Sequence, residues 1–139
     1  MSTTRELLEL AAVAMGYTTT HKWNSERLAL IPPVDALVVH KDGELVTTGW
    51  NPSEESGHSF DMAIKLKLHI GVESHTISAW HSDDFGNFQT VTIAHFGERA
   101  AGRRAVLLAA AHIGRKMLCT VHNDPLFKGL SCKSCGWRR

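Results

Sequence analysis

The chain has 139 residues, of which 43% are hydrophobic and 21% are charged, as is typical of one folded globular domain. Its formal net charge of +1 provides no general field that would attract nucleic acid or an anionic membrane, and it excludes an acidic mimic of DNA. No apolar run is long enough to cross a bilayer, and the first residues lead into an amphipathic stretch, so we expect a soluble intracellular protein.

The first predicted element is a helix. Thr3 and Glu6 have the spacing of a capping box, and Gly16 stands where a left-handed residue often ends a helix. The expected buried face of this helix consists of Leu7, Leu10, Ala11 and Ala14.

Four extended segments are expected to follow as an antiparallel meander. They cover residues 17–23, 28–31, 36–40 and 45–50. The last two segments are separated by Lys41-Asp42-Gly43-Glu44, in which Asp-Gly is a strong hairpin signal.

Helices and strands alternate in the remainder of the predicted domain. A second helix is expected over residues 59–68, strands over 76–81 and 88–95, and a third helix over 98–118. The expected buried residues of the two helices are Phe60, Ala63, Ile64 and Leu68 in the former, and Val106, Ala109, Ala110, Ile113 and Met117 in the latter. The order of elements predicts an α+β fold, with about three helices packed against an antiparallel sheet, over residues 1–118.

Several local strings, taken with this order of elements, resemble the phage ABA-sandwich family of bacteriophage and prophage proteins. The matching strings are Leu7-Leu8-Glu9-Leu10-Ala11-Ala12, Trp50-Asn51-Pro52, Ala63-Ile64-Lys65-Leu66, Arg103-Arg104-Ala105 and Ala109-Ala110-Ala111-His112-Ile113-Gly114. The resemblance implies a sheet covered by helices, a phage gene and the cytoplasm of a bacterial host. It implies no catalytic residue, and it does not extend to the C-terminal tail.

The tail, residues 119–139, contains all three cysteines of the chain. Together with His122, these residues give the pattern C-x2-H-x9-C-x2-C, in which two paired half-sites are joined by a loop. Three thiolates and one imidazole form a common closed, tetrahedral zinc site. We therefore predict a structural zinc ion bound by Cys119, His122, Cys132 and Cys135, in a tail packed on the third helix.

Two other interpretations of the cysteines remain open. The C-x2-C pair is either reduced and without consequence, with Cys119 buried in the helix, or Cys132 and Cys135 form a redox pair. A thioredoxin-like motif normally opens a helix inside a βαβ unit, whereas this pair lies in a glycine-bounded tail.

The tail also concentrates positive charge. It holds four lysines and arginines against one aspartate, a net charge of +3, whereas the other 118 residues hold 11 against 13, a net charge of −2. Lys133, Trp137, Arg138 and Arg139 are the candidate partner-binding residues, because tryptophan and arginine are enriched in interface hot spots. The alternative role for Trp137 is to cap the zinc knuckle.

Nine histidines invite a search for acid–base catalysis. His58 with Asp61, and His81 with Asp83 and Asp84, have the composition of a general base with an orienting carboxylate. Neither pair comes with a recognisable nucleophile or oxyanion donor, so we expect solvated histidines and no enzyme. We expect His112 to be a packed or surface histidine rather than a further metal ligand.

Two classes of function remain. The first is a non-enzymatic phage accessory protein that binds a host or phage protein and inhibits or redirects it, as anti-CRISPR proteins do with a host defence component. The second is a small zinc-dependent nucleic-acid-binding protein that uses the basic tail. The small charge of a metal-bound tail favours the first class. The sequence predicts neither the target nor the oligomeric state.

Overall fold

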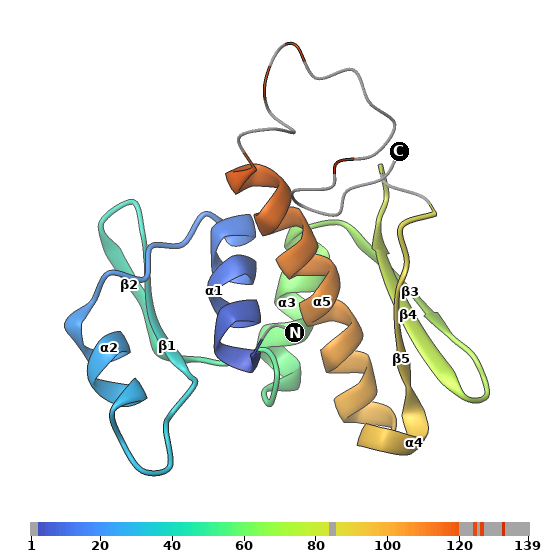
Figure 1. The fold of residues 1–139 in the computed structure, drawn as a ribbon, viewed down its shortest axis with the longest axis horizontal. Coiled ribbons are helices and arrows are strands. Elements are labelled where there is room, and N and C mark those ends of the chain that lie inside the picture. The colour runs from blue at the N-terminus through green and yellow to red at the C-terminus, as the bar shows by residue number, and fades with distance from the viewer. Residues whose placement is uncertain (1–2, 84–85, 120–123, 125, 127–131, 133–139) are drawn as a thin grey trace.

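The computed structural model describes residues 3–83, 86–119, 124, 126 and 132 and has an α+β fold (Figure 1). Its helices are α1 (Thr4–Met15), α2 (Lys22–Leu28), α3 (Ser56–Lys65), α4 (Ile93–Phe96) and α5 (Glu98–Leu118). Its strands are β1 (Leu37–Lys41), β2 (Glu44–Trp50), β3 (Leu68–Val72), β4 (Thr76–His81) and β5 (Gln89–Thr92). No helix within these residues is both long enough and apolar enough to cross a membrane.

The strands form two antiparallel sheets. One pairs β1 with β2, and the other has the order β3-β4-β5. Helix α5 packs against all three strands of the second sheet and against α1, α3 and α4. Figure 1 shows the result: the second sheet covers one side of α5, α1 lies on the other side, and the β1-β2 hairpin with α2 lies beyond α1.

The first helix confirms the prediction from the capping box. The Thr3 hydroxyl accepts a hydrogen bond from the Glu6 N–H at 3.2 Å, and Gly16 ends the helix with a φ of 75°. Helix α1 crosses α5 at very short range, because a Cβ atom placed on Gly114 would lie 1.9 Å from the Leu10 carbonyl oxygen. Only glycine allows the two backbones to approach this closely.

The prediction was wrong for most of residues 17–31. Thr18 makes an isolated bridge to His40, but the segment then forms α2 instead of strands. His21 begins this helix: its Nδ1 accepts the Trp23 N–H at 3.1 Å, as an N-cap side chain does. The apolar run 28–31 is not a buried strand, because Leu28, Leu30 and Ile31 are exposed.

The predicted second helix was also displaced. The observed helix covers Ser56–Lys65. Lys67, with a φ of 55°, then turns the chain into β3, a strand that was not predicted from the sequence. Ala63 is buried as predicted, but Phe60 and Ile64 are exposed, and Ser59 and Met62 are buried in their place. The helix therefore presents a different face to the core.

Two smaller corrections concern the last elements. Strand β5 ends at Thr92, and the expected strand residues 93–95 lie in the short helix α4 (Ile93–Phe96). In α5, Val106, Ala109 and Ala110 are buried as predicted, whereas Met117 is 52% exposed.

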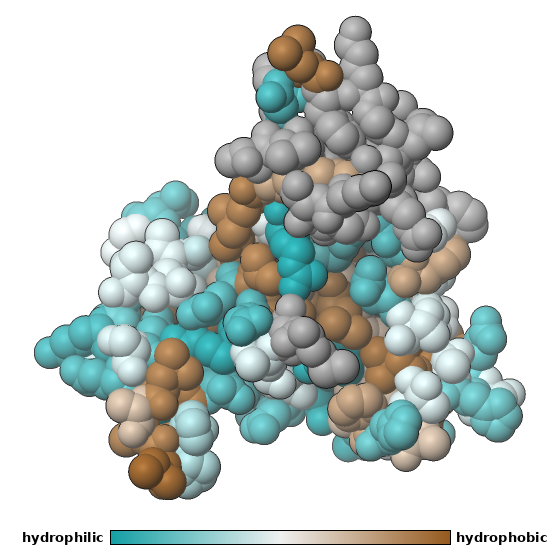
Figure 2. All heavy atoms as spheres, in the orientation of Figure 1, coloured by the Kyte–Doolittle hydropathy of each residue, from teal (hydrophilic) through white to brown (hydrophobic). Residues whose placement is uncertain are grey.

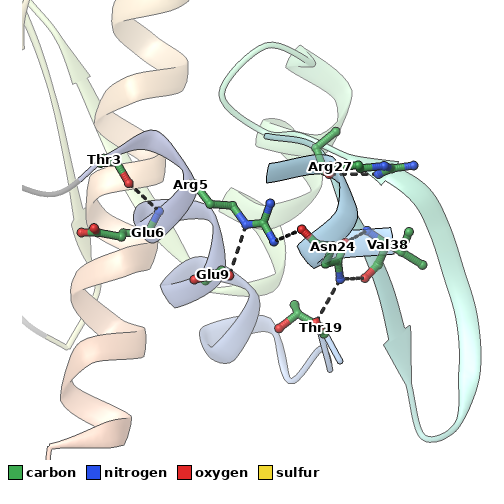
Figure 3. Close-up of polar contacts among 9 residues, drawn as sticks. Thr3, Arg5, Glu6, Glu9, Thr19, Asn24, Arg27 and Val38 are labelled. Carbon is green, nitrogen blue, oxygen red and sulfur yellow. Dashed lines mark hydrogen bonds and ion pairs between the residues drawn. The ribbon is translucent and has the colours of Figure 1, made fainter. Parts of the chain in front are cut away.

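Asn24 joins α2 to the first sheet, because its side-chain amide makes the hydrogen bonds that the backbone of a neighbouring strand would make (Figure 3). Its Oδ1 accepts the Val38 N–H at 2.8 Å, and its Nδ2 donates to the Val38 carbonyl at 2.9 Å and to the Thr19 carbonyl at 3.0 Å. The Arg5 guanidinium donates to the Asn24 carbonyl at 2.8 Å and to Glu9 at 3.2 Å. Asn24 thus connects α2 to β1 through its side-chain amide and to α1 through its backbone carbonyl.

Replacing Asn24 with alanine is expected to lower the free energy of unfolding by roughly 2 to 4 kcal/mol, because it leaves two buried backbone groups of Val38 without a partner. Urea denaturation followed by circular dichroism measures this change. Ser25→Ala is the matched control, since the exposed Ser25 hydroxyl bonds only within its own helix, to the Lys22 carbonyl, and its loss should cost under about 0.5 kcal/mol. Equal losses in the two variants would contradict the strand-like role of Asn24.

Candidate metal centre and exposed apolar surface

Two of the four predicted zinc ligands lie side by side at the end of α5. Cys119 is the C-cap residue of that helix, and its N–H donates to the Lys116 carbonyl. The Sγ atoms of Cys119 and Cys132 are 3.6 Å apart, and both residues are buried, with 9% and 2% of their surface exposed. The fold therefore brings together two thiols that are separated by thirteen positions in the chain.

The distance between the sulfur atoms bears on their chemistry. The two cysteines do not form a disulfide with each other, which would require about 2.05 Å between the sulfurs. In a tetrahedral site with Zn–S bonds of about 2.3 Å, two thiolate sulfurs lie about 3.8 Å apart. The observed separation matches one edge of such a tetrahedron, and it also suits a weak hydrogen bond between two thiols. Because this distance suits both arrangements, zinc binding by the pair stays a prediction.

His122 and Cys135, the other two predicted ligands, lie outside the described residues, as do Lys133, Trp137, Arg138 and Arg139. Among the residues whose positions are described, no three histidine, cysteine or acidic side chains converge as a metal site would require. The four-ligand site, and the division into residues 1–118 and a tail at 119–139, stay predictions.

The two histidine–carboxylate pairs have a different geometry from a catalytic dyad. The Nδ1 atom of His58 accepts the Asn51 N–H at 3.1 Å, and that of His81 accepts the Asp83 N–H at 3.1 Å. In each imidazole a backbone amide donates to Nδ1, and Asp84 lies outside the described residues. These contacts organise the approach to α3 and the turn after β4.

His112 contacts Asn87 across the fold. The Nε2 of His112 and the Nδ2 of Asn87 are 2.8 Å apart, which connects α5 to the residues before β5. His112 and His81 also line a small cavity of about 80 Å³ together with Ile113 and Lys116. Its packed position agrees with the sequence-based expectation for His112.

An exposed apolar surface, which the sequence analysis missed, lies on α2 and the loop that follows it. Figure 2 shows hydrophobic atoms gathered at the tip of this loop. We define the α2 surface as Trp23, Leu28, Leu30, Ile31 and Val34, which are between 39% and 98% exposed. Ile31 is the most exposed of these residues, at 98%. The apolar run 28–31 was the available signal, but the sequence predicted only an extended segment there.

Arg27 connects the α2 surface to the residues beneath it through two hydrogen bonds to backbone carbonyls. Its Nη1 donates to the Ala36 carbonyl at 2.9 Å, beyond the loop, and to the Thr48 carbonyl of β2 at 2.7 Å. Its guanidinium also lies 5.9 Å from the centre of the Trp23 ring, within the range of a cation–π contact. The loop is thus anchored at its base while its apolar side chains face outward.

No protein-family model, curated protein or solved structure matches this chain. The resemblance to the phage ABA-sandwich family therefore stays an expectation from the sequence strings alone.

Proposed function

We propose that this protein is a non-enzymatic binding protein that attaches to a protein target through the α2 surface. The observation that carries the proposal is Ile31, which is 98% exposed at the tip of an anchored loop. Contiguous exposed apolar side chains are uncommon on monomeric proteins unless they bind something. Tryptophan and arginine next to each other, as at Trp23 and Arg27, are the residue types most enriched in binding hot spots.

The charges around the α2 surface favour a protein over a nucleic acid. Between residues 22 and 35 the positive side chains Lys22 and Arg27 are balanced by the negative Glu26 and Asp35. A surface without net charge gains nothing from neutralising phosphates, which supplies most of the affinity in nucleic-acid binding. The expected partner therefore presents an apolar pocket that accommodates Ile31.

The biological setting of this proposal comes from the resemblance described above. A phage-encoded protein in the cytoplasm of a bacterial host would act by occupying, and so inhibiting or redirecting, its target. A host defence component is the class of target that we propose. The zinc ion would be structural, because three thiolates and one imidazole leave no open coordination position.

The test is capture of a target from the lysate of phage-infected bacteria with the tagged full chain, followed by measurement of the dissociation constant with the purified target. Ile31→Asp is expected to weaken binding roughly 30-fold, because loss of a hot-spot contact costs at least about 2 kcal/mol. Leu45→Asp, at an exposed apolar position on β2, is the matched control and should bind as the parent protein does.

Two outcomes would contradict the proposal. In the first, Ile31→Asp and Leu45→Asp bind equally well, so that the α2 surface is not the interface. In the second, single- or double-stranded DNA is bound at low salt and binding is lost when Arg138→Ala and Arg139→Ala are combined. That result would favour the alternative, a zinc-dependent nucleic-acid-binding protein.

A further inference from the structure

The outer edges of the β1-β2 sheet are partly occupied. On β1, Asn24 hydrogen bonds to both backbone groups of Val38, and Thr18 bridges to His40. On β2, the Thr48 carbonyl accepts a hydrogen bond from Arg27. Backbone N–H and C=O groups that an added strand would need are thus already hydrogen bonded to side chains or to the Thr18 bridge.

Strand β3 is the edge strand of the second sheet, and within the described part of the chain it has only β4 as a neighbour. The backbone hydrogen bonds at its two ends identify the groups that face outward. The Glu73 N–H donates to the Thr76 carbonyl at 2.9 Å, and the Ser82 N–H donates to the Lys67 carbonyl at 3.3 Å. Because hydrogen-bonded positions alternate along an antiparallel pair, the odd-numbered residues of β3 bond to β4. The N–H and C=O groups of Leu68, Ile70 and Val72 therefore point away from the sheet.

The side chains of these three residues extend the buried face of the sheet. Ile70 pairs with Ala79 and Val72 with Ile77, and both partners on β4 are buried on the side that packs against α5. Ile70 and Val72 lie on the same face but are 46% and 72% exposed. The apolar face is therefore wider than the helices that cover it.

Strand β3 also lacks the features that normally prevent edge pairing. Its sequence, LHIGV, contains no lysine, acidic residue or proline, and its register with β4 is continuous over all five residues. Natural edge strands usually carry a charge, a proline or a bulge at such positions. An unprotected apolar edge of this kind is a template for another strand.

We propose that β3 pairs antiparallel with β3 of a second copy, about a two-fold axis at Ile70, and so joins two sheets into one of six strands. The outward-facing residues are symmetric about Ile70, so Ile70 faces Ile70 of the partner subunit and Leu68 faces the partner's Val72. Each of these pairs exchanges backbone hydrogen bonds and places apolar side chains together on the α5 side. His69 then faces the partner's Gly71, which has no side chain to crowd the imidazole.

A second copy suits this edge better than an unrelated strand does. A two-fold contact requires a surface that is complementary to itself, and LHIGV meets that condition in both hydrogen-bond direction and side-chain pattern. The pairing also covers Ile70 and Val72, the most exposed apolar residues of the strand. The edge is separate from the α2 surface, so the two proposals can fail independently.

The full chain is expected to sediment at twice its mass of 15.3 kDa, and Ile70→Lys is expected to sediment as a monomer. The substitution places two like charges opposite each other at the centre of the pairing. Val46→Lys is the matched control, because Val46 has the same 46% exposure on β2, and this variant should remain a dimer. A parent chain that stays monomeric up to its solubility limit, or an Ile70→Lys variant that stays dimeric, would overturn the proposal.

Mixing two variants tests the position of the axis. Ile70→Glu alone is expected to be monomeric for the same reason as Ile70→Lys, whereas an equimolar mixture of the two should recover the dimer, since lysine then faces glutamate. This rescue requires that residue 70 lie opposite residue 70 of the second copy. Circular dichroism of each variant checks that it is folded, and a folded mixture that remains monomeric would overturn the proposed register.

Discussion

Gly114→Ala is expected to destabilise the fold by roughly 4 kcal/mol, which places it among the most damaging single methyl additions. The added Cβ would lie 1.9 Å from the carbonyl oxygen of Leu10 and 2.7 Å from its carbonyl carbon. Both atoms belong to the backbone of α1, so no side chain can rotate away to make room. The two helices must separate, and the contacts between the buried Leu7, Ala11 and Ala110 are then weakened.

A second glycine of the same helix provides the control. A Cβ on Gly102 would meet only the Cδ1 atom of Ile77, at an ordinary contact distance of 3.8 Å. Gly102→Ala should therefore stabilise the protein, by up to about 1 kcal/mol, through the higher helix propensity of alanine. Thermal and urea unfolding of both variants give the comparison. Losses of the same size at both positions would show that α1 and α5 do not cross at Gly114.

Removal of one predicted ligand is expected to abolish zinc binding. The full chain, purified under reducing conditions, should contain about one zinc per molecule. Cys132→Ser should contain almost none, because the three ligands that remain bind zinc far more weakly than the four of the parent chain. Elemental analysis and a thiol-sensitive zinc indicator measure the metal directly. Chelation should also lower the melting temperature of the parent chain but leave that of Cys132→Ser unchanged.

Two variants control for general effects on the tail and on imidazoles. Ser134→Ala changes a neighbour within the same C-x2-C segment, and His95→Ala removes a histidine outside the predicted set; both should retain the metal. His122→Ala and Cys135→Ser should lose it, as Cys132→Ser does. A metal-free parent chain would end the zinc hypothesis and leave Cys119 and Cys132 as two buried thiols in contact.

The elements with strong local signals could be predicted from the sequence. The capping box of α1, its Gly16 stop and the long α5 were expected within a residue or two. So was the β1-β2 hairpin, where Asp42 and Gly43 have φ values of 53° and 81°, as the predicted two-residue turn requires. In each case one or two residue types determine the local conformation.

The wrong predictions have two physical causes. Phe60 and Ile64 were expected to be buried, but hydrophobicity alone does not show which apolar side chains the tertiary fold leaves exposed. Strand β3 was missed because a lysine with positive φ, Lys67, turns the chain at a position that carries no turn signal. For the metal site, spacing predicted four ligands, and the structure describes two of these residues, Cys119 and Cys132.

Helix α5 also determines how the molecule can open. Because this one helix contacts α1, α3, α4 and every strand of the second sheet, these elements cannot separate from one another without losing their contacts with α5. The interior of this part of the fold is therefore expected to unfold in one cooperative step. A truncated chain that lacks this helix would retain two sheets with no shared support.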